Sequence, residues 1–195
     1  MKKTPARETS AGSYSPAERI VATATRLFES QGYAATGINQ IIAESKTAKA
    51  SFYDHFASKE LLGKEYLARY GQNHLVLIRT LMERAVSADD FIRAWVRILK
   101  RQLRLKKFYG CPMSNLRAQT GNSSPVLARE VKLLAEKTIA VIADYLEQLK
   151  PGTSAPLAAR RIFSAYEGAI HIWQLIGDEA ALDDIEFMAR AVLAA

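Results

Sequence analysis

Apolar residues recur at intervals of three and four along most of this chain, which is the spacing of amphipathic helices. The first helix is expected to start after Ser15, because Pro16 and Glu18 complete a capping box with proline at the first helical position. Gly32 is a typical stop signal. The buried positions of this helix are expected to be Ile20, Val21, Ala24, Leu27 and Phe28. No alternating pattern of any length predicts a strand, so we expect an all-α fold of about nine helices.

Residues 36–56, which read TGINQIIAESKTAKASFYDHF, contain two short helical patterns separated by a few residues without apolar periodicity. This arrangement is typical of a helix-turn-helix. Thr36 is expected to cap the first of the two helices. The second helix is expected to start near Ala48 and to bury Phe52 and Phe56. Its other side chains are small, basic or hydrogen-bonding, which suits a helix that enters the major groove of DNA.

Together with the flanking segments ERIVATATRLFESQGYAATGINQI and ASKELLGKEYL, this stretch resembles the DNA-binding domain of the TetR family of transcriptional regulators. The resemblance rests on an amphipathic helix that ends in LF, followed by GY, AT and a helix-turn-helix that closes on SFYDHFASKE. It implies a three-helix DNA-binding domain followed by a helical domain for ligand binding and dimerisation. The implied function is that of a homodimeric regulator, more often a repressor, which a small-molecule or electrophile effector releases from a pseudo-palindromic operator.

Three parts of the chain are expected. Residues 1–13 lack apolar periodicity and are expected to form a flexible arm, either a disordered tail or one whose Lys2, Lys3 and Arg7 contact DNA. Residues 14–57 are the expected helix-turn-helix domain, and residues 58–195 the expected effector-binding and dimerisation domain. A long helix from Ser58 to Arg84 is expected to link the two. Further helices are predicted over residues 90–107, 113–119, 124–149, 156–176 and 183–194.

Two groups of residues are candidates for DNA contact. The resemblance implies that one group of side chains, at the edges of the two helices, contacts DNA phosphates. For Tyr53 and His55 the alternative is that they pack the helix corner. The members of this group are Thr36, Tyr53, His55 and Lys59. The second group is expected to read base edges, because lysine can bind guanine and the methyl groups of Ala and Thr can meet thymine. Its members are Lys46, Thr47, Lys49, Ala50 and Ser51.

The sequence departs from the family pattern at Lys46, Thr47, Ala48 and Ala50. Lys46 stands where the turn usually has glycine, and a left-handed conformation costs other residues roughly 1–2 kcal/mol. Ala48 replaces a common capping serine, so Thr47 is expected to act as the cap of the second helix.

A pocket between helices is expected in the second part of the chain, because aromatic residues and a helix interrupted by Gly and Pro occur there. Plain core packing is the alternative for each candidate lining residue. The candidates are Tyr70, Trp95, Leu99, Phe108, Cys111, Met113, Leu116, Tyr166, Ile170 and Trp173. The single cysteine, Cys111, follows a basic stretch and is either an inert packed residue or a sensor thiol. The expected effector is therefore apolar or electrophilic.

The dimer contact is expected on the last two helices, which carry an excess of apolar residues. The expected contact residues are Ile162, Tyr166, Ile170, Trp173, Ile185, Met188 and Val192.

Charge does not locate the DNA site. The whole chain has a net charge of +7, but residues 1–60 hold eight basic and six acidic residues, a net of +2. Basic residues gather instead between Arg97 and Lys107, on a face that is either solvated or directed at DNA or an acidic ligand. A nonspecific architectural DNA-binding protein, or a ligand-binding protein with a decayed helix-turn-helix, remains an alternative.

Enzyme signals are weak. His55, His74 and His171 stand apart, and we find no phosphate loop, nucleophile elbow or carboxylate cluster. We therefore expect neither an enzyme nor a metal or other cofactor. The chain has no apolar run of membrane-spanning length and no pattern of a signal peptide, so a cytoplasmic location is expected.

Overall fold

The computed structural model describes residues 14–151 and 154–194, and the expected flexible arm of residues 1–13 lies outside this range. The described residues form nine α-helices and one 3₁₀ turn without a strand, which confirms the predicted all-α fold. Within this part of the chain, no helix combines the length and the apolar character that a membrane span needs. The elements are α1 Pro16–Ser30, α2 Ile38–Ser45, α3 Lys49–His55, α4 Lys59–Arg84, α5 Ala88–Arg104, α6 Pro112–Thr120, α7 Pro125–Leu149, α8 Ala155–Ile176, η1 Glu179–Asp183 and α9 Asp184–Ala194.

Helix α1 starts as the sequence predicts. The Ser15 hydroxyl accepts a hydrogen bond from the Glu18 N–H, and the Glu18 carboxylate accepts one from the Ser15 N–H at 2.7 Å. These bonds satisfy two polar groups that a helix start would otherwise leave to water. The five predicted apolar positions are all buried, and they pack α1 onto α2, α3 and α4.

Helix α2 starts after Gly37, so the prediction that Thr36 caps it is wrong. The Thr36 hydroxyl is occupied elsewhere, because it donates to the Gly32 carbonyl at 2.7 Å and accepts from the Gln31 side chain at 3.2 Å. Thr36 thus fastens the loop between α1 and α2 and is itself fully buried.

The turn between α2 and α3 is closed by the backbone. Lys46 adopts the predicted left-handed conformation, with φ 53° and ψ 46°. In this conformation the N–H groups of Lys46 and Thr47 both reach carbonyls in the last turn of α2, at 3.2 Å each. The prediction that Thr47 caps α3 is wrong. Ala48 is the N-cap and makes no side-chain hydrogen bond there, while the Thr47 hydroxyl bonds to that of Ser45 at 2.8 Å.

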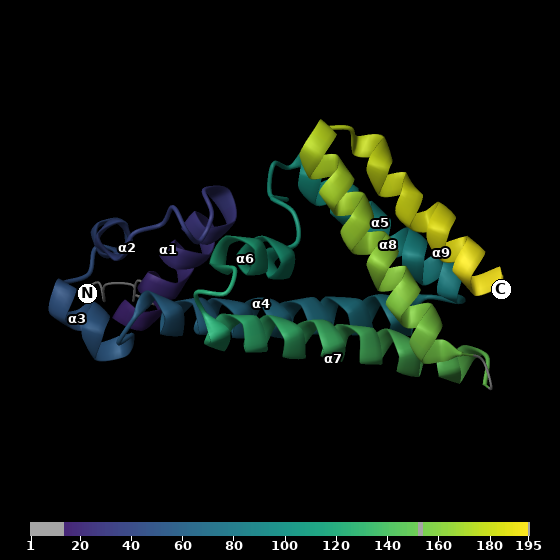
Figure 1. The fold of residues 1–195 in the computed structure, drawn as a ribbon, viewed down its shortest axis with the longest axis horizontal. Coiled ribbons are helices and arrows are strands. Elements are labelled where there is room, and N and C mark those ends of the chain that lie inside the picture. The colour runs from purple at the N-terminus through teal and green to yellow at the C-terminus, as the bar shows by residue number, and fades with distance from the viewer. Residues whose placement is uncertain (1–13, 152–153, 195) are drawn as a thin grey trace, which may run out of the picture.

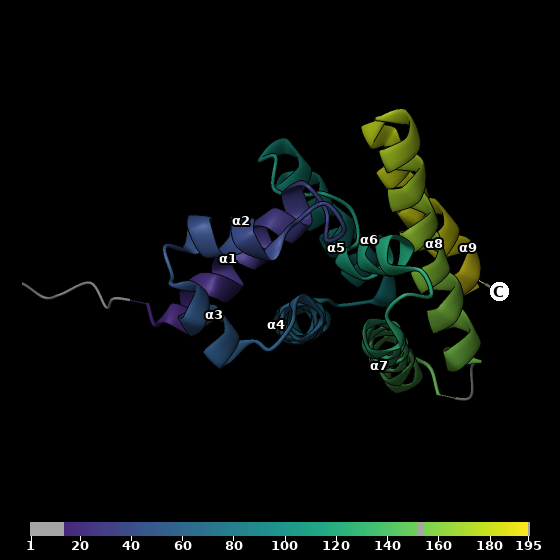
Figure 2. The ribbon, with the colours of Figure 1, turned by 60° about the vertical axis from the view of Figure 1, so that its left-hand side comes forward.

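The helix pair α4 and α7 forms the long axis of the molecule (Figure 1). Helices α1–α3 pack at one end of this pair and α8 and α9 at the other, with α6 between them. Turning the molecule shows α4 and α7 still adjacent and α8–α9 far from α1–α3 (Figure 2). The starts of α4 and α7 are joined by Ser124, whose hydroxyl caps α7 and donates to the Glu60 carboxylate.

Two hydrophobic clusters fill this frame. The first joins α1–α3 to the start of α4 and includes Ile20, Phe52, Leu62 and Leu116. The second joins the end of α4 to α5, α7, α8 and α9. Helices α4 and α6 contribute buried residues to both clusters. They therefore connect the two ends of the molecule.

The apolar excess of α8 and α9 is distributed differently from the prediction. Ile162, Tyr166, Ile170 and Ile185 are buried within the chain, so they cannot be contact residues for a partner. The reason is that α8 is apolar on nearly all sides, and its sequence does not tell which side faces the core. The apolar side chains that remain exposed there are Ile172, Leu175, Ile176, Phe187 and Met188.

The left-handed residue in the helix-turn-helix leads to a stability prediction. Lys46→Gly removes a strain of about 1 kcal/mol from the turn, partly offset by the larger freedom of glycine in the unfolded chain. We expect the variant to be more stable than the parent by up to about 1 kcal/mol in urea unfolding. The matched control is Lys137→Gly, at an exposed position inside α7, which should lose about 1 kcal/mol. Equal losses in both variants would contradict the strained turn.

Candidate DNA-binding surface and ligand cavity

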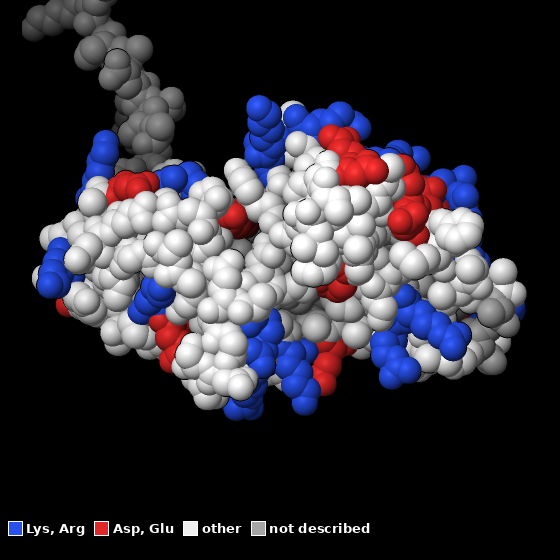
Figure 3. Space-filling model, turned by 45° about the horizontal axis from the view of Figure 1, so that its top comes forward, with Lys and Arg blue, Asp and Glu red and all other residues white. Residues whose placement is uncertain are grey.

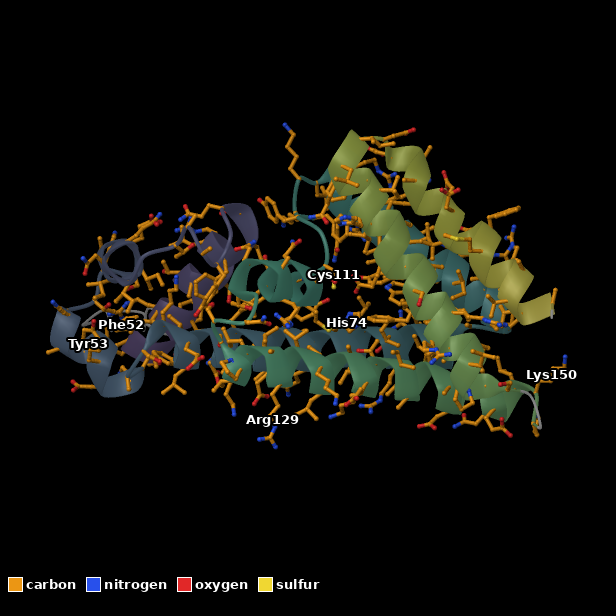
Figure 4. The ribbon with its side chains drawn as sticks, viewed as in Figure 1. Phe52, Tyr53, His74, Cys111, Arg129 and Lys150 are labelled. Carbon is orange, nitrogen blue, oxygen red and sulfur yellow. The ribbon has the colours of Figure 1, made fainter. Side chains whose placement is uncertain are left out.

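Helix α3 presents a surface that is free to contact DNA. Phe52 is fully buried and anchors the helix, whereas Tyr53, which follows it, is 45% exposed. The two rings pack edge to face with their centres 5.3 Å apart, and Figure 4 labels both residues on α3. Lys49, Ala50 and His55 are exposed as well. Packing at the helix corner therefore does not hide Tyr53 or His55.

The structure places the other candidates for DNA contact around this surface. Lys46 is exposed, whereas Thr47 and Ser51 are half-buried. The full burial of Thr36 is not compatible with the expected phosphate contact by its side chain. The predicted phosphate contact is therefore wrong for the same reason as the predicted cap, because the Thr36 hydroxyl is hydrogen-bonded within the loop.

Lys59 has a structural task that the sequence does not reveal. Its ammonium donates to the carbonyls of Tyr33 and Thr36, at 3.0 Å each, and lies 4.4 Å from the centre of the Tyr33 ring. Partial burial lowers the pKa of this lysine. Two of its three N–H groups thus hold the loop between α1 and α2 against α4, which leaves one for a phosphate.

The basic residues of α5 do not extend the surface of α3. Lys100 pairs with Asp183 at 2.5 Å and so ties α5 to η1, whereas Arg93 pairs with Asp89 of the same helix at 3.3 Å. Arg97, Arg101 and Arg104 are exposed. Figure 3 shows basic and acidic side chains interspersed around a broad uncharged area rather than one continuous basic face.

A cavity of about 700 Å³ lies at the junction of α1, α4, α5 and α6. In Figure 3 the surface is hollowed between the two ends of the molecule. Most of the lining comes from the domain that was expected to bind the effector, but α1 also contributes residues. These are Val21, Ala22, Thr25, Phe28 and Glu29. An occupant would therefore touch the helix that carries the helix-turn-helix.

Six of the ten predicted lining residues are on the wall of this cavity, namely Tyr70, Trp95, Leu99, Phe108, Leu116 and Tyr166. The other four are not. Met113 belongs to the buried core, and Trp173 packs against Phe108 with ring centres 5.1 Å apart. Cys111 and Ile170 line a separate, smaller cavity between α6 and α8. On α8, Tyr166 lines the large cavity and Ile170, one turn further along, lines the smaller one.

One wall of the large cavity is a series of aromatic rings that includes a histidine. The ring of His74 stacks on Tyr70 at 5.4 Å and lies 6.3 Å from Trp95, which stacks on Tyr166 at 4.5 Å. Burial lowers the pKa of His74 to about 4, so the imidazole is neutral at neutral pH. Sequence reasoning missed His74, although its spacing from Tyr66 and Tyr70 puts all three on one face of α4.

Cys111 sits at the start of α6 and is 1% exposed. Burial is the largest effect on its thiol, and together with the nearby Glu167 carboxylate it raises the pKa well above the ordinary value. The thiol is therefore protonated at neutral pH, and thiols react as thiolates. The nearby lysines and arginines of the sequence do not counteract this effect. Of the two alternatives, the inert packed residue fits the structure.

Helix α6 joins the cavity to the loop between α1 and α2. Leu116 packs in the cluster around α1, and the Gln119 side-chain oxygen accepts a hydrogen bond from the Ala34 N–H at 3.0 Å. Both side chains also line the cavity. A displacement of α6 by an occupant would thus act directly on this loop.

Comparison with known proteins gives a consistent result. A family model described as bacterial regulatory proteins, tetR family, matches residues 20–66. The chain is 32% identical over 160 residues to the HTH-type transcriptional regulator LmrA of Bacillus subtilis, covering 78% of this chain and 83% of that protein. It is 24% identical over 127 residues to the HTH-type transcriptional repressor DhaR of Mycobacterium sp. (strain GP1), covering 63% and 61%. A TetR-family transcriptional regulator from Streptomyces coelicolor has a similar structure, with a TM-score of 0.81, 25% identity and coverage of 92% and 95%.

The burial of Cys111 predicts its reactivity. Treatment of the folded protein with N-ethylmaleimide at neutral pH should give no adduct by mass spectrometry, because the thiol is buried and protonated. The same treatment in urea should add one maleimide, since the sequence contains one cysteine. A rapid adduct on the folded protein would restore the sensor interpretation.

Proposed function

The chain belongs to the TetR family of bacterial regulatory proteins, and from this premise we propose how it regulates transcription. It is a DNA-binding transcriptional regulator. Our proposal is a homodimeric repressor that leaves a pseudo-palindromic operator when a small molecule fills the large cavity. The observation that carries it is a cavity whose wall includes α1 of the helix-turn-helix unit. The repressor assignment is supported by the similarity to the transcriptional repressor DhaR.

DNA recognition is assigned to α3 and the turn before it. Lys46, Lys49 and Ala50 are exposed and carry the groups that suit base edges, with the half-buried Thr47 and Ser51 beside them. Tyr53 and His55 are assigned to phosphates, which fix the position of the helix without reading the sequence. Lys59 contributes one remaining N–H to the same task.

The dimer contact is assigned to the outer faces of α8 and α9. Leu175, Ile176 and Phe187 are each exposed by 65% or more, and Ile172 and Met188 lie on the same two helices. An apolar surface on two packed helices suits an isologous contact with a second copy, in which four helices pack together. Two-fold symmetry then brings the two α3 helices to half-sites about 34–36 Å apart, or a multiple of that distance.

The effector acts in this proposal through α1 and α6. Both helices line the cavity, and both pack against the cluster that anchors α3. An occupant favours the arrangement of α1 and α6 that accommodates it, and so shifts the spacing of the two recognition helices. The effector is apolar rather than electrophilic in this proposal, because the buried Cys111 is a poor target for electrophiles.

The proposed division of the chain follows from these roles. Residues 14–57 bind DNA, residues 58–195 bind the effector and the second copy, and residues 1–13 precede both. The cluster around α1 also includes residues of α4, α6 and α7, which supports direct coupling between the two parts. A cytoplasmic location is proposed because the partner is DNA.

Fluorescence anisotropy on the DNA upstream of the protein's own gene tests the proposed function, with a shuffled duplex as control near 0.15 M salt. We expect at least about thousandfold tighter binding to the upstream DNA, as is usual for specific sites. Equal affinities would instead indicate an architectural DNA-binding protein, and absent binding to any promoter DNA a decayed helix-turn-helix.

Two variants separate base reading from phosphate contact. Tyr53→Ala should weaken binding to operator and shuffled DNA by the same factor, because a phosphate contact carries no sequence information. Lys49→Ala should reduce the ratio between the two affinities, by a factor of about 5–150, because a base contact is worth roughly 1–3 kcal/mol. Fluorescence anisotropy on both duplexes measures the two affinities of each variant. Identical effects of the two variants would contradict the assignment of roles.

A charge on the outer face of α9 should break the dimer. Phe187→Glu places a carboxylate in the proposed apolar contact, so sedimentation at micromolar concentration should change from a dimer to a monomer of 21.6 kDa. Val76→Glu is the matched control, because Val76 is exposed and apolar but lies on α4. This control should remain dimeric. A monomeric parent protein would contradict the proposed mechanism.

A further inference from the structure

The large cavity contains a polar atom without a hydrogen-bonding partner. Among the buried side-chain nitrogen and oxygen atoms of the described residues, His74 Nε2 alone has none. The side chain of His74 is 7% exposed, lines the cavity and comes from the middle of α4 (Figure 4). Leaving a buried polar atom without a partner is unfavourable, so an occupant that supplies one gains affinity.

The surroundings of His74 favour a flat apolar ring. Tyr70, Trp95 and Tyr166 form the aromatic wall together with the imidazole, and Leu99 lines the same cavity. Aromatic rings prefer offset-stacked or edge-to-face contacts with other rings. The volume of about 700 Å³ lies in the upper half of the usual range for ligand pockets, which leaves room for more than a single ring.

The charges of the lining argue against an ionic ligand. Glu29, Arg69 and Lys107 come from three different elements, and Arg69 is already paired with Glu65 at 2.6 Å. Burial raises the pKa of Glu29. The lining therefore offers no cluster of like charge that would compensate a charged group.

The neutral imidazole determines the polar group of the ligand. One nitrogen of a neutral histidine donates and the other accepts, so Nε2 has one of the two roles, depending on the tautomer. A hydroxyl group can serve in either case, because it both donates and accepts.

We propose that the cavity binds an uncharged, planar compound of at least two fused aromatic rings whose hydroxyl group hydrogen-bonds to His74 Nε2. This inference rests on the proposed function, because it names the chemical class of the effector. His74 is then the residue that distinguishes a hydroxylated ring from a plain one. The aromatic wall binds both kinds of ring by stacking.

Three probes with the same ring system test this specificity by calorimetry on the full chain without DNA. The probes are 2-naphthol, naphthalene and 2-naphthoate. We expect 2-naphthol to bind about tenfold more tightly than naphthalene, the ratio that one hydrogen bond of typical strength gives. We expect 2-naphthoate to bind at least about tenfold more weakly than 2-naphthol, since the lining has no cluster of basic side chains to compensate the cost of burying its carboxylate.

Variants of His74 identify the partner of the hydroxyl. His74→Phe keeps an aromatic ring of similar size, so it should bind naphthalene with unchanged affinity and lose the preference for 2-naphthol. His74→Gln offers an amide near the place of Nε2 and should retain part of the preference. His171→Phe is the matched control, because His171 lies on α8 and lines the smaller cavity. This control should behave like the parent.

The proposal is overturned if the parent protein binds 2-naphthol and naphthalene equally, binds neither, or binds 2-naphthoate most tightly. It is also overturned by a preference for 2-naphthol that survives in His74→Phe. DNA affinity is measured separately on the same preparations. Failure to bind any promoter DNA contradicts the proposed regulator, whereas the calorimetric ratios alone decide the ligand class.

Discussion

The structure depends on the sharing of α4 between two hydrophobic cores. Its first turns bury Leu62 and Tyr66 in the cluster that anchors α3, and its last turns bury Ile78 and Met82 in the cluster that holds α8 and α9. A helix of 26 residues is stiff over this length, so neither core can rotate freely relative to the other. The position of α3 is therefore linked through α4 to that of α8 and α9, whose outer faces we propose as the dimer contact.

The cavity lies where these two cores meet, which explains both its composition and its proposed role. A site between cores is lined by residues from each of them, so Phe28 of α1 and Trp95 of α5 lie on the same cavity. It also contains polar side chains that a closed core would exclude, His74 among them. We infer that the same feature serves affinity and regulation, because an occupant satisfies the polar atom and contacts both cores at once.

The sequence predicts those parts of the fold that depend on local hydrogen bonds and helical spacing. The capping box at Ser15 and the buried stripe of α1 are confirmed, because both follow from neighbours in the chain. The sequence does not determine which face of an all-apolar helix points inward, so the expected contact residues on α8 turned out to be core. The prediction that Thr36 caps α2 is wrong for a similar reason, since its hydroxyl hydrogen-bonds to the Gly32 carbonyl within a tight loop. The role of His74 was missed because it depends on the aromatic rings of α5 and α8 that pack near it, and these helices are distant in sequence.

The helix-turn-helix shows how tertiary packing can replace local signals. Helix α3 has seven residues, an alanine as its N-cap and a strained lysine before it, so its own sequence gives it little stability. It is held instead by Phe52, which is fully buried against α1 and α4. A recognition helix stabilised by packing responds to any shift of α1, whereas a strongly capped one would be more independent of it. The departures from the family pattern between Lys46 and Ala50 are therefore compatible with function, and they make α3 more dependent on the helices that line the cavity.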